Sequence, residues 1–120
     1  VEFMEKVAQS KIVLGFSVSP STWGYWSNRV GKVLLAGGFL LYQYAPGMEL
    51  FLRDGADYFG SIKEANDKIS YYLKEERERE RIADRGLVIA RDQFTSKARI
   101  ADLMILIERY LKKGDTLWLL

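Results

Sequence analysis

The hydrophobic pattern is strongest over residues 33–48, a run of sixteen residues that contains no charged side chain. Lys32 stands directly before this run and Glu49 directly after it. A membrane-spanning helix usually needs about eighteen or more such residues, so the run falls just short of that length. The buried core of a folded domain also produces short apolar runs. The sequence on either side of the run therefore decides between the two interpretations.

The flanks of the run carry signals for the start and the end of a helix. Ser19 precedes Pro20. This pair is typical of a helix start, because serine caps free N–H groups and proline at the first position loses no hydrogen bond. Pro46 and Gly47 mark the other end. The roughly 25 residues between the prolines span about 38 Å as a helix, more than a bilayer core of about 30 Å. We therefore predict a transmembrane helix over residues 20–46.

Aromatic and basic residues gather near both ends of this predicted helix. Tryptophan and tyrosine are enriched at the two membrane–water interfaces, and long basic side chains near helix ends extend their charges into the interface. The pattern predicts seven membrane-interface anchors, which are Trp23, Tyr25, Trp26, Arg29, Lys32, Tyr42 and Tyr44.

Small residues recur along one side of the predicted helix. Glycine or alanine returns every seven residues, which is nearly two helical turns, and one serine lies beside this row. Each glycine costs a helix about 1 kcal/mol, and close approach of another membrane helix compensates that cost. The predicted helix-packing stripe is Gly24, Ser27, Gly31, Gly38 and Ala45. Two alternatives remain, namely a buried hairpin of a soluble domain and a helix broken by a turn at residues 37–38.

The rest of the chain divides into an N-terminal segment, a connector and a C-terminal arm. Residues 1–19 combine a short helix over 2–10 with an extended stretch over 12–18, where apolar positions alternate with others. Residues 47–60 form a connector punctuated by glycines. Residues 61–120 are expected to form an amphipathic helical arm.

Helical signals dominate this arm. Ser61 and Glu64 match a capping box, in which the two side chains bond backbone N–H groups at the helix start. Residues 74–85 interleave acidic and basic side chains and predict a solvated helix, which Gly86 interrupts. An amphipathic helix is then expected over residues 97–113. Its predicted partner-facing stripe is Ile100, Leu103, Met104, Ile107 and Leu111.

Composition narrows the chemistry that the chain can carry out. The 120 residues include no cysteine and no histidine, which excludes disulfides, thiolate metal sites, a Ser-His-Asp triad and an HExxH zinc helix. The 18 basic and 16 acidic residues give a net charge of only +2, without the basic excess of nucleic-acid binders. No phosphate-loop or calcium-loop motif occurs. We therefore expect no enzyme activity, no catalytic, cofactor-binding or metal-binding residues, no cofactor, no nucleic-acid partner and no small-molecule substrate.

One charged stretch has a local resemblance to a known family. Residues 71–83 are similar to the stretch that follows the membrane helix in subunit e of mitochondrial ATP synthase, a small subunit that also carries glycines in its membrane helix. The resemblance covers thirteen residues of low complexity. The stretch also begins farther from the hydrophobic run than it does in that family. The resemblance therefore implies only the general class of small membrane-complex subunits and does not identify the family of this chain.

The sequence as a whole predicts a mainly α fold, in which a single-pass transmembrane helix precedes a long charged and amphipathic helical arm that can fold back as a hairpin. The predicted function is that of a structural accessory subunit of a membrane complex, such as a respiratory-chain or ATP synthase assembly in the mitochondrial inner membrane. Its partners would be other subunits and the lipid bilayer. The alternatives are a soluble helical protein-interaction module with residues 33–52 as its core, and a self-oligomerising membrane protein.

Overall fold

A computed structural model describes residues 2–25 and 27–112 of the chain. Within these residues the chain forms a three-stranded parallel sheet in the order β1-β2-β3. The strands are β1 (Val13–Gly15), β2 (Leu40–Gln43) and β3 (Asp57–Phe59). The helices are α1 (Glu2–Gln9), α2 (Asn28–Leu35), α3 (Met48–Leu52), α4 (Ile62–Lys74), α5 (Glu76–Gln93) and α6 (Ser96–Lys112).

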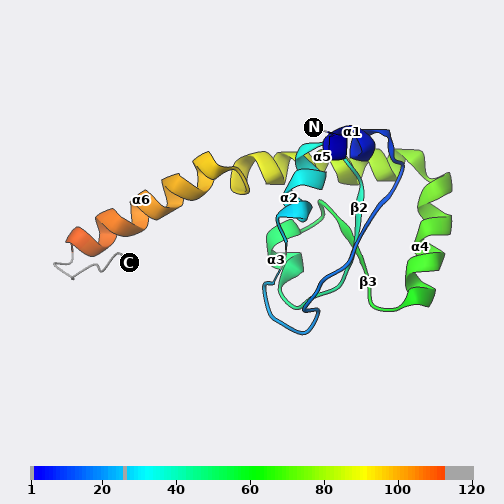
Figure 1. The fold of residues 1–120 in the computed structure, drawn as a ribbon, viewed down its shortest axis with the longest axis horizontal. Helices are drawn as coiled ribbons and strands as arrows, with labels where there is room; N and C mark the ends of the chain where they lie inside the picture. The colour runs from blue at the N-terminus through cyan, green and yellow to red at the C-terminus, as the bar shows by residue number, and fades with distance from the viewer. Residues whose placement is uncertain (1, 26, 113–120) are drawn as a thin grey trace.

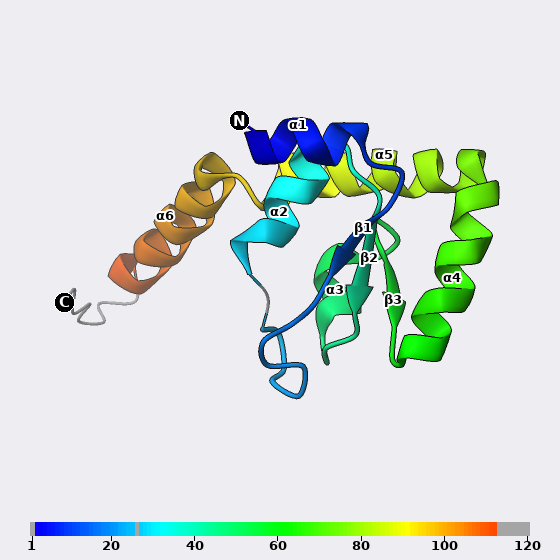
Figure 2. The same cartoon turned by 45° about the vertical axis from the view of Figure 1, so that its right-hand side comes forward.

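Helices cover the sheet on both faces and at one end (Figures 1 and 2). Parallel neighbours cannot be joined by a tight turn, so each pair of strands needs a crossover. Helix α2 supplies the crossover from β1 to β2, and α3 supplies the crossover from β2 to β3. Helix α5 passes across the end of the sheet at which the strands begin (Figure 1).

The central strand β2 is buried on both of its faces. Leu40 and Tyr42, both at most 2% exposed, point into one core cluster with residues of α2 and α3. Leu41, which is 0% exposed, points into the other cluster with residues of α4 and α5. Side chains of a strand alternate between faces, so a strand covered on both sides is apolar throughout. This is the physical origin of the apolar run over residues 33–48.

The structure contradicts the predicted fold class and the predicted transmembrane helix over residues 20–46. This segment contains a loop, helix α2, a turn, strand β2 and a second turn. Among the residues that the structure describes, no helix is long and apolar enough to cross a membrane. The predictions of integral membrane localisation and of the mitochondrial inner membrane are therefore wrong. The alternative of a helix broken at residues 37–38 is right about the break, but strand β2 follows it in place of the rest of the helix.

Two local features explain why the apolar run is not one helix. Gly37 has a φ of +76°, a backbone conformation that side chains with a Cβ rarely adopt. Gly38 packs so tightly that a Cβ there would lie 2.6 Å from Val7 Cγ1. The helix also starts later than predicted, because Ser27 is its N-cap residue and Ser19 and Pro20 lie in the loop before it.

Several other sequence predictions are confirmed. Helix α1 and strand β1 fall inside the predicted helical and extended stretches. The Ser61 cap of α4 is present, since Ser61 Oγ accepts the Glu64 N–H at 3.1 Å, while Glu64 Oε2 accepts the N–H of Gly60, one residue before the cap, at 2.9 Å. Gly86, in contrast, does not interrupt the charged helix, because α5 continues through it.

A polar cluster fixes α4 against the edge of the sheet. The Tyr72 hydroxyl donates to Asp57 Oδ2 at 2.7 Å, and Lys68 Nζ donates to Asp57 Oδ1 at 3.1 Å. Burial, followed by the Asp57 hydrogen bond, raises the pKa of Tyr72. Because these groups satisfy one another, the cluster is a structural joint between β3 and α4.

Gly86 allows α5 to approach the turn before β3. A Cβ at Gly86 would lie 2.5 Å from the Gly55 carbonyl oxygen and 2.9 Å from Leu34 Cδ2. The reverse contact is equally close, since a Cβ at Gly55 would lie 2.7 Å from Gly86 Cα. Backbone atoms cannot retreat as a flexible side chain can, so both positions require glycine.

We predict that Gly86→Ala destabilises the protein even though alanine is the better helix former. Helix propensity alone would stabilise the variant by about 1 kcal/mol. Overpacking against Gly55 costs about 1–3 kcal/mol or more, so a net loss is expected. Chemical denaturation measures the free energy of unfolding, and Val88→Ala on the exposed face of α5 is the control. A Gly86→Ala variant more stable than the parent would contradict the contact.

Helix α6 extends away from the rest of the domain (Figure 1). None of its residues is buried, and Ile100, Leu103, Met104 and Leu111 are more than half exposed. The predicted hairpin with the first helix of the arm is therefore wrong. All five residues of the predicted apolar stripe lie on this one helix. That the stripe faces a partner stays a prediction.

We predict that the double substitution Leu103→Gln and Met104→Gln leaves the stability of the domain unchanged. These side chains pack against no core cluster among the described residues, so their removal creates no cavity. The thermal unfolding midpoint should shift by no more than about 1 °C, whereas Leu34→Ala, at a fully buried position, should lower it by roughly 10 °C or more. A large loss in the α6 variant would show that α6 packs on the domain.

Candidate functional site

A cavity of about 190 Å³ lies between β1, β2 and α2. Its walls are mostly apolar, and its polar side chains are those of Ser27, Arg29 and Tyr42. The complete lining is Phe3, Val13, Leu14, Gly15, Phe16, Ser27, Arg29, Val30, Val33, Leu40 and Tyr42. Ligands of parallel α/β sheets usually bind where strands end and the following helices begin. Helix α2 runs antiparallel to the strands and begins near their carboxyl ends (Figure 2). The cavity reaches that edge at Gly15 and Ser27, and it extends along the sheet to Val13 and Leu40, where β1 and β2 begin.

The first turn of α2 has free hydrogen-bonding capacity. Ser27 is the N-cap residue, but its side chain accepts no hydrogen bond from the helix. The Val30 N–H is bonded to the Ser27 carbonyl oxygen at 3.1 Å. The N–H groups of Asn28 and Arg29 precede it and have no capping side chain. The positive end of a helix dipole and its free N–H groups together attract anions.

Arg29 places a full positive charge at the same helix end. Its side chain lines the cavity, and the residue is exposed. It forms no ion pair with any residue that the structure describes. Lys32, one turn later on α2, is also exposed but does not line the cavity. Arg29 is therefore the cation best placed to meet an anionic ligand at this site.

Tyr42 places a buried hydroxyl on the same cavity. The residue is 2% exposed, and its hydroxyl makes no hydrogen bond of normal geometry with any described residue. Burial raises the pKa of Tyr42, while the neighbouring Ser17 hydroxyl and the charge of Arg29 oppose that rise. The hydroxyl is consequently protonated at neutral pH and is available as a donor. Gly15 makes room for the ring, because a Cβ there would collide with Tyr42.

A second hollow, of about 250 Å³, lies on the other side of the α2 N-terminus. It is lined by Ser27, Asn28, Gly31, Phe94 and Arg99. The Arg99 guanidinium lies 3.0 Å from Asp102 on α6, and this pair is exposed. Because its charge is already paired, Arg99 is a weaker candidate for anion binding than Arg29.

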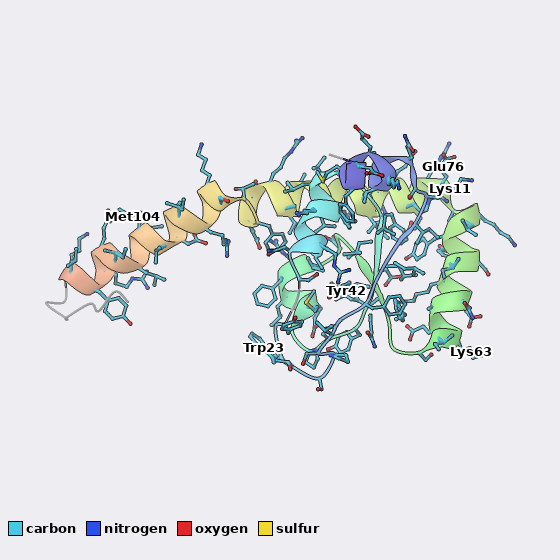
Figure 3. All side chains as sticks on the ribbon, in the orientation of Figure 1. Lys11, Trp23, Tyr42, Lys63, Glu76 and Met104 are labelled. Atoms are coloured by element: carbon cyan, nitrogen blue, oxygen red, sulfur yellow. The ribbon has the colours of Figure 1, made fainter. Side chains whose placement is uncertain are left out.

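Exposed aromatic side chains surround the carboxyl edge of the sheet. Trp23 is 64% exposed and packs edge-to-face on Phe51, with ring centroids 5.9 Å apart. The Tyr44 hydroxyl donates to Glu49 Oε1 at 3.2 Å. Figure 3 shows Trp23 near the lower end of the domain and Tyr42 closer to its centre. These aromatic rings form the border of the edge and are not part of the cavity lining.

The structure distributes the predicted helix-packing stripe over different elements. Gly24 has a φ of +69° in the loop before α2, Ser27 stands at the N-cap position of α2 without a capping hydrogen bond, and Gly31 lies within the helix. Gly38 and Ala45 lie before and after β2. The five residues do not share one helix face, so the row that the spacing predicted does not exist. Ser27 alone lines the cavity.

The predicted interface anchors are also separated. Arg29 and Tyr42 meet at the cavity. Trp23, Tyr25 and Tyr44 lie exposed around the carboxyl edge, and Lys32 is exposed on α2. Trp26 lies outside the described residues. Because the transmembrane helix is absent among the described residues, nothing in the structure supports an anchoring role.

Sequence reasoning missed the cavity, although some of its residues had been singled out for another reason. The alternating stretch over 12–18, a serine suited to an N-cap position at Ser27 and an apolar strand after Gly38 together have the pattern of a βαβ unit. That pattern would have placed Gly15 and Arg29 at one edge of a sheet. The apolar run masked it, because a buried strand and a buried helix look alike at that length.

Comparison with known proteins gives one family. The model of a family described as glycosyl transferase-like matches residues 2–105. Searches of curated proteins and of solved structures found no match. The match overturns the prediction of a respiratory-chain accessory subunit. It agrees better with the alternative in which residues 33–52 form the core of a folded module. The chain belongs to the glycosyl transferase-like family.

Proposed function

We propose that this domain holds the activated sugar donor of a glycosyl transfer reaction. In this proposal a phosphate group of the donor binds at the N-terminus of α2, beside Arg29. The family supports the reaction class. The position of the cavity at the carboxyl edge of a parallel sheet supports the place of binding.

The observation that carries the proposal is the combination, on one cavity, of a helix start without a side-chain cap and an arginine that has no ion pair among the described residues. When a sugar is transferred, the bond between its anomeric carbon and the leaving group breaks, and the leaving oxygen gains negative charge. Groups that are already oriented toward that charge lower the barrier of the reaction. Arg29 and the first N–H groups of α2 are such groups, and each can hydrogen bond to a phosphate oxygen.

The absence of cysteine and histidine is compatible with this role. Stabilising a leaving phosphate needs positive charge and N–H donors, and it needs neither a thiolate nor an imidazole. The sequence-based expectation of no enzyme activity depended on the missing catalytic motifs. Binding of a phosphate by a helix N-terminus needs none of these motifs, so their absence does not exclude it. A small-molecule substrate is accordingly part of the proposal.

The exposed stripe on α6 favours a second role, which is contact with another protein surface. Four of its five residues, Ile100, Leu103, Met104 and Leu111, are more than half exposed, and so is Ile105 beside them. Large exposed apolar patches often mark interaction sites. This contact would be independent of donor binding, because α6 points away from the sheet (Figure 1).

We predict that Arg29→Gln weakens binding of inorganic pyrophosphate by about tenfold or more. The estimate follows from the loss of one charge-assisted hydrogen bond, which contributes about 1.5–3 kcal/mol. Isothermal titration calorimetry on the full chain at moderate salt measures the dissociation constant. The unfolding midpoint should be unchanged, because Arg29 is exposed and makes no ion pair among the described residues.

Lys32→Gln is the matched control, since it removes the same charge from the same helix at a position outside the cavity. It should weaken binding by less than about threefold, because an exposed charge farther away is screened by salt. Equal losses in the two variants would reduce the effect to net charge. No pyrophosphate binding by the parent chain would contradict the proposed function.

A further inference from the structure

We propose that a hollow at the edge where the strands begin binds a free α-amino acid, whose carboxylate pairs with the buried guanidinium of Arg79. The hollow has a volume of about 280 Å³ and is lined by the first half of α5, the end of α1 and the turn before β2. Figure 3 shows two of its residues, Lys11 and Glu76, at the opposite end of the domain from Trp23. The hollow shares no lining residue with the cavity beside α2, so this inference does not rest on the proposed function.

The first argument is the burial of an arginine without an opposite charge. Among the described residues Arg79 is the only charged side chain that is buried, with 7% of its surface exposed. It forms no ion pair with any of these residues. Removing a charge from water is costly unless an opposite charge or hydrogen bonds compensate the loss. The carboxylate of a ligand would supply the opposite charge.

The second argument is that the structural role of Arg79 leaves part of its guanidinium unused. Nη1 donates to the Tyr72 carbonyl oxygen in the last turn of α4, a group that has no partner within the helix. This bond caps α4 and explains why the side chain lies inward. A guanidinium has further N–H donors in a rigid fork that matches the two oxygens of a carboxylate. Arg79 lines the hollow, so a ligand there can approach these donors.

The third argument is the balance of charge around the hollow. Lys11, Glu76 and Glu80 line it together with Arg79, and all three are exposed. None of the four forms an ion pair with a residue that the structure describes. Two positive and two negative side chains give no net attraction for a simple anion or a simple cation. A zwitterion satisfies both signs, because its ammonium group can face the glutamates while its carboxylate faces Arg79.

The fourth argument is the size of the hollow and its apolar floor. Pockets for drug-sized ligands have volumes of roughly 300–1,000 Å³, so a hollow of about 280 Å³ suits a smaller molecule. Phe39 and Ala83 are buried beneath it. The aliphatic side chain of an amino acid would pack on these two residues and lose apolar surface to water. We therefore choose L-leucine as the probe.

The test measures binding of L-leucine to the full chain at pH 7 by heteronuclear NMR titration. We expect a dissociation constant of roughly 1 mM, as befits a small ligand in an open hollow. L-leucinamide lacks the carboxylate and N-acetyl-L-leucine lacks the ammonium group, so each should bind at least about tenfold more weakly. Pyrophosphate at saturation should leave the L-leucine affinity unchanged, because the two sites lie at opposite edges.

The double substitution Glu76→Gln and Glu80→Gln should reverse part of this selectivity. It should weaken L-leucine by about tenfold, because the ammonium group loses its charged partners. It should strengthen N-acetyl-L-leucine, because the repulsion between its carboxylate and the two glutamates is gone. A variant that is merely less stable would not bind one ligand more tightly and the other more weakly. Arg79→Lys should weaken both ligands, since lysine keeps the charge but lacks the fork.

Glu75→Gln is the matched control, because it removes an exposed carboxylate beside the start of α5 that does not line the hollow. It should change the L-leucine affinity by less than about threefold, since an exposed charge outside the site is screened. No L-leucine binding at about 50 mM would overturn the inference. Equal binding of L-leucine and L-leucinamide, or competition between L-leucine and pyrophosphate, would overturn it as well.

Discussion

The rest of the structure depends on the burial of strand β2 on both of its faces. Leu40, Leu41 and Tyr42 alternate between two core clusters and are almost completely shielded from water. A parallel strand in this position needs a helical crossover on each side of it in the chain. The crossover into β2 is α2, and its antiparallel course brings its first turn to the carboxyl edge. The geometry of the candidate site is therefore a direct consequence of how the core is built.

The sequence predicts the local structure of this chain well where one signal is clear, such as a regular spacing of apolar residues or a residue that caps a helix. The capping box at Ser61 and Glu64 defines the start of α4, and the apolar spacing after residue 96 defines α6. Residues 33–48 could not be read in the same way, because one apolar run contains the end of α2, a turn and the whole of β2. The turn itself is carried by Gly37 and Gly38, and seven-residue spacing of glycines imitates a helix-packing row. Whether this run forms one helix or a helix, a turn and a strand depends on contacts between residues far apart in the sequence, such as that of Gly38 with Val7.

The candidate site was only partly accessible to sequence reasoning for a related reason. Arg29 and Tyr42 stand thirteen positions apart, and only the pairing of β2 with β1 beside α2 brings them to one cavity. Tyr42 then serves two purposes. Its ring fills the core, while its hydroxyl lies on the cavity near Ser17 and Arg29.

The central claim is that the carboxyl edge around α2 is a ligand site, and amide chemical shifts test it most directly. A ¹⁵N-labelled full chain would be titrated with inorganic pyrophosphate and followed by heteronuclear NMR. The account predicts saturable shifts concentrated on residues 15–17, on residues 28–30 and on residues 42–43, where β1 ends, α2 begins and β2 ends. Shifts concentrated on α4 or α6, or none at millimolar ligand, would contradict it.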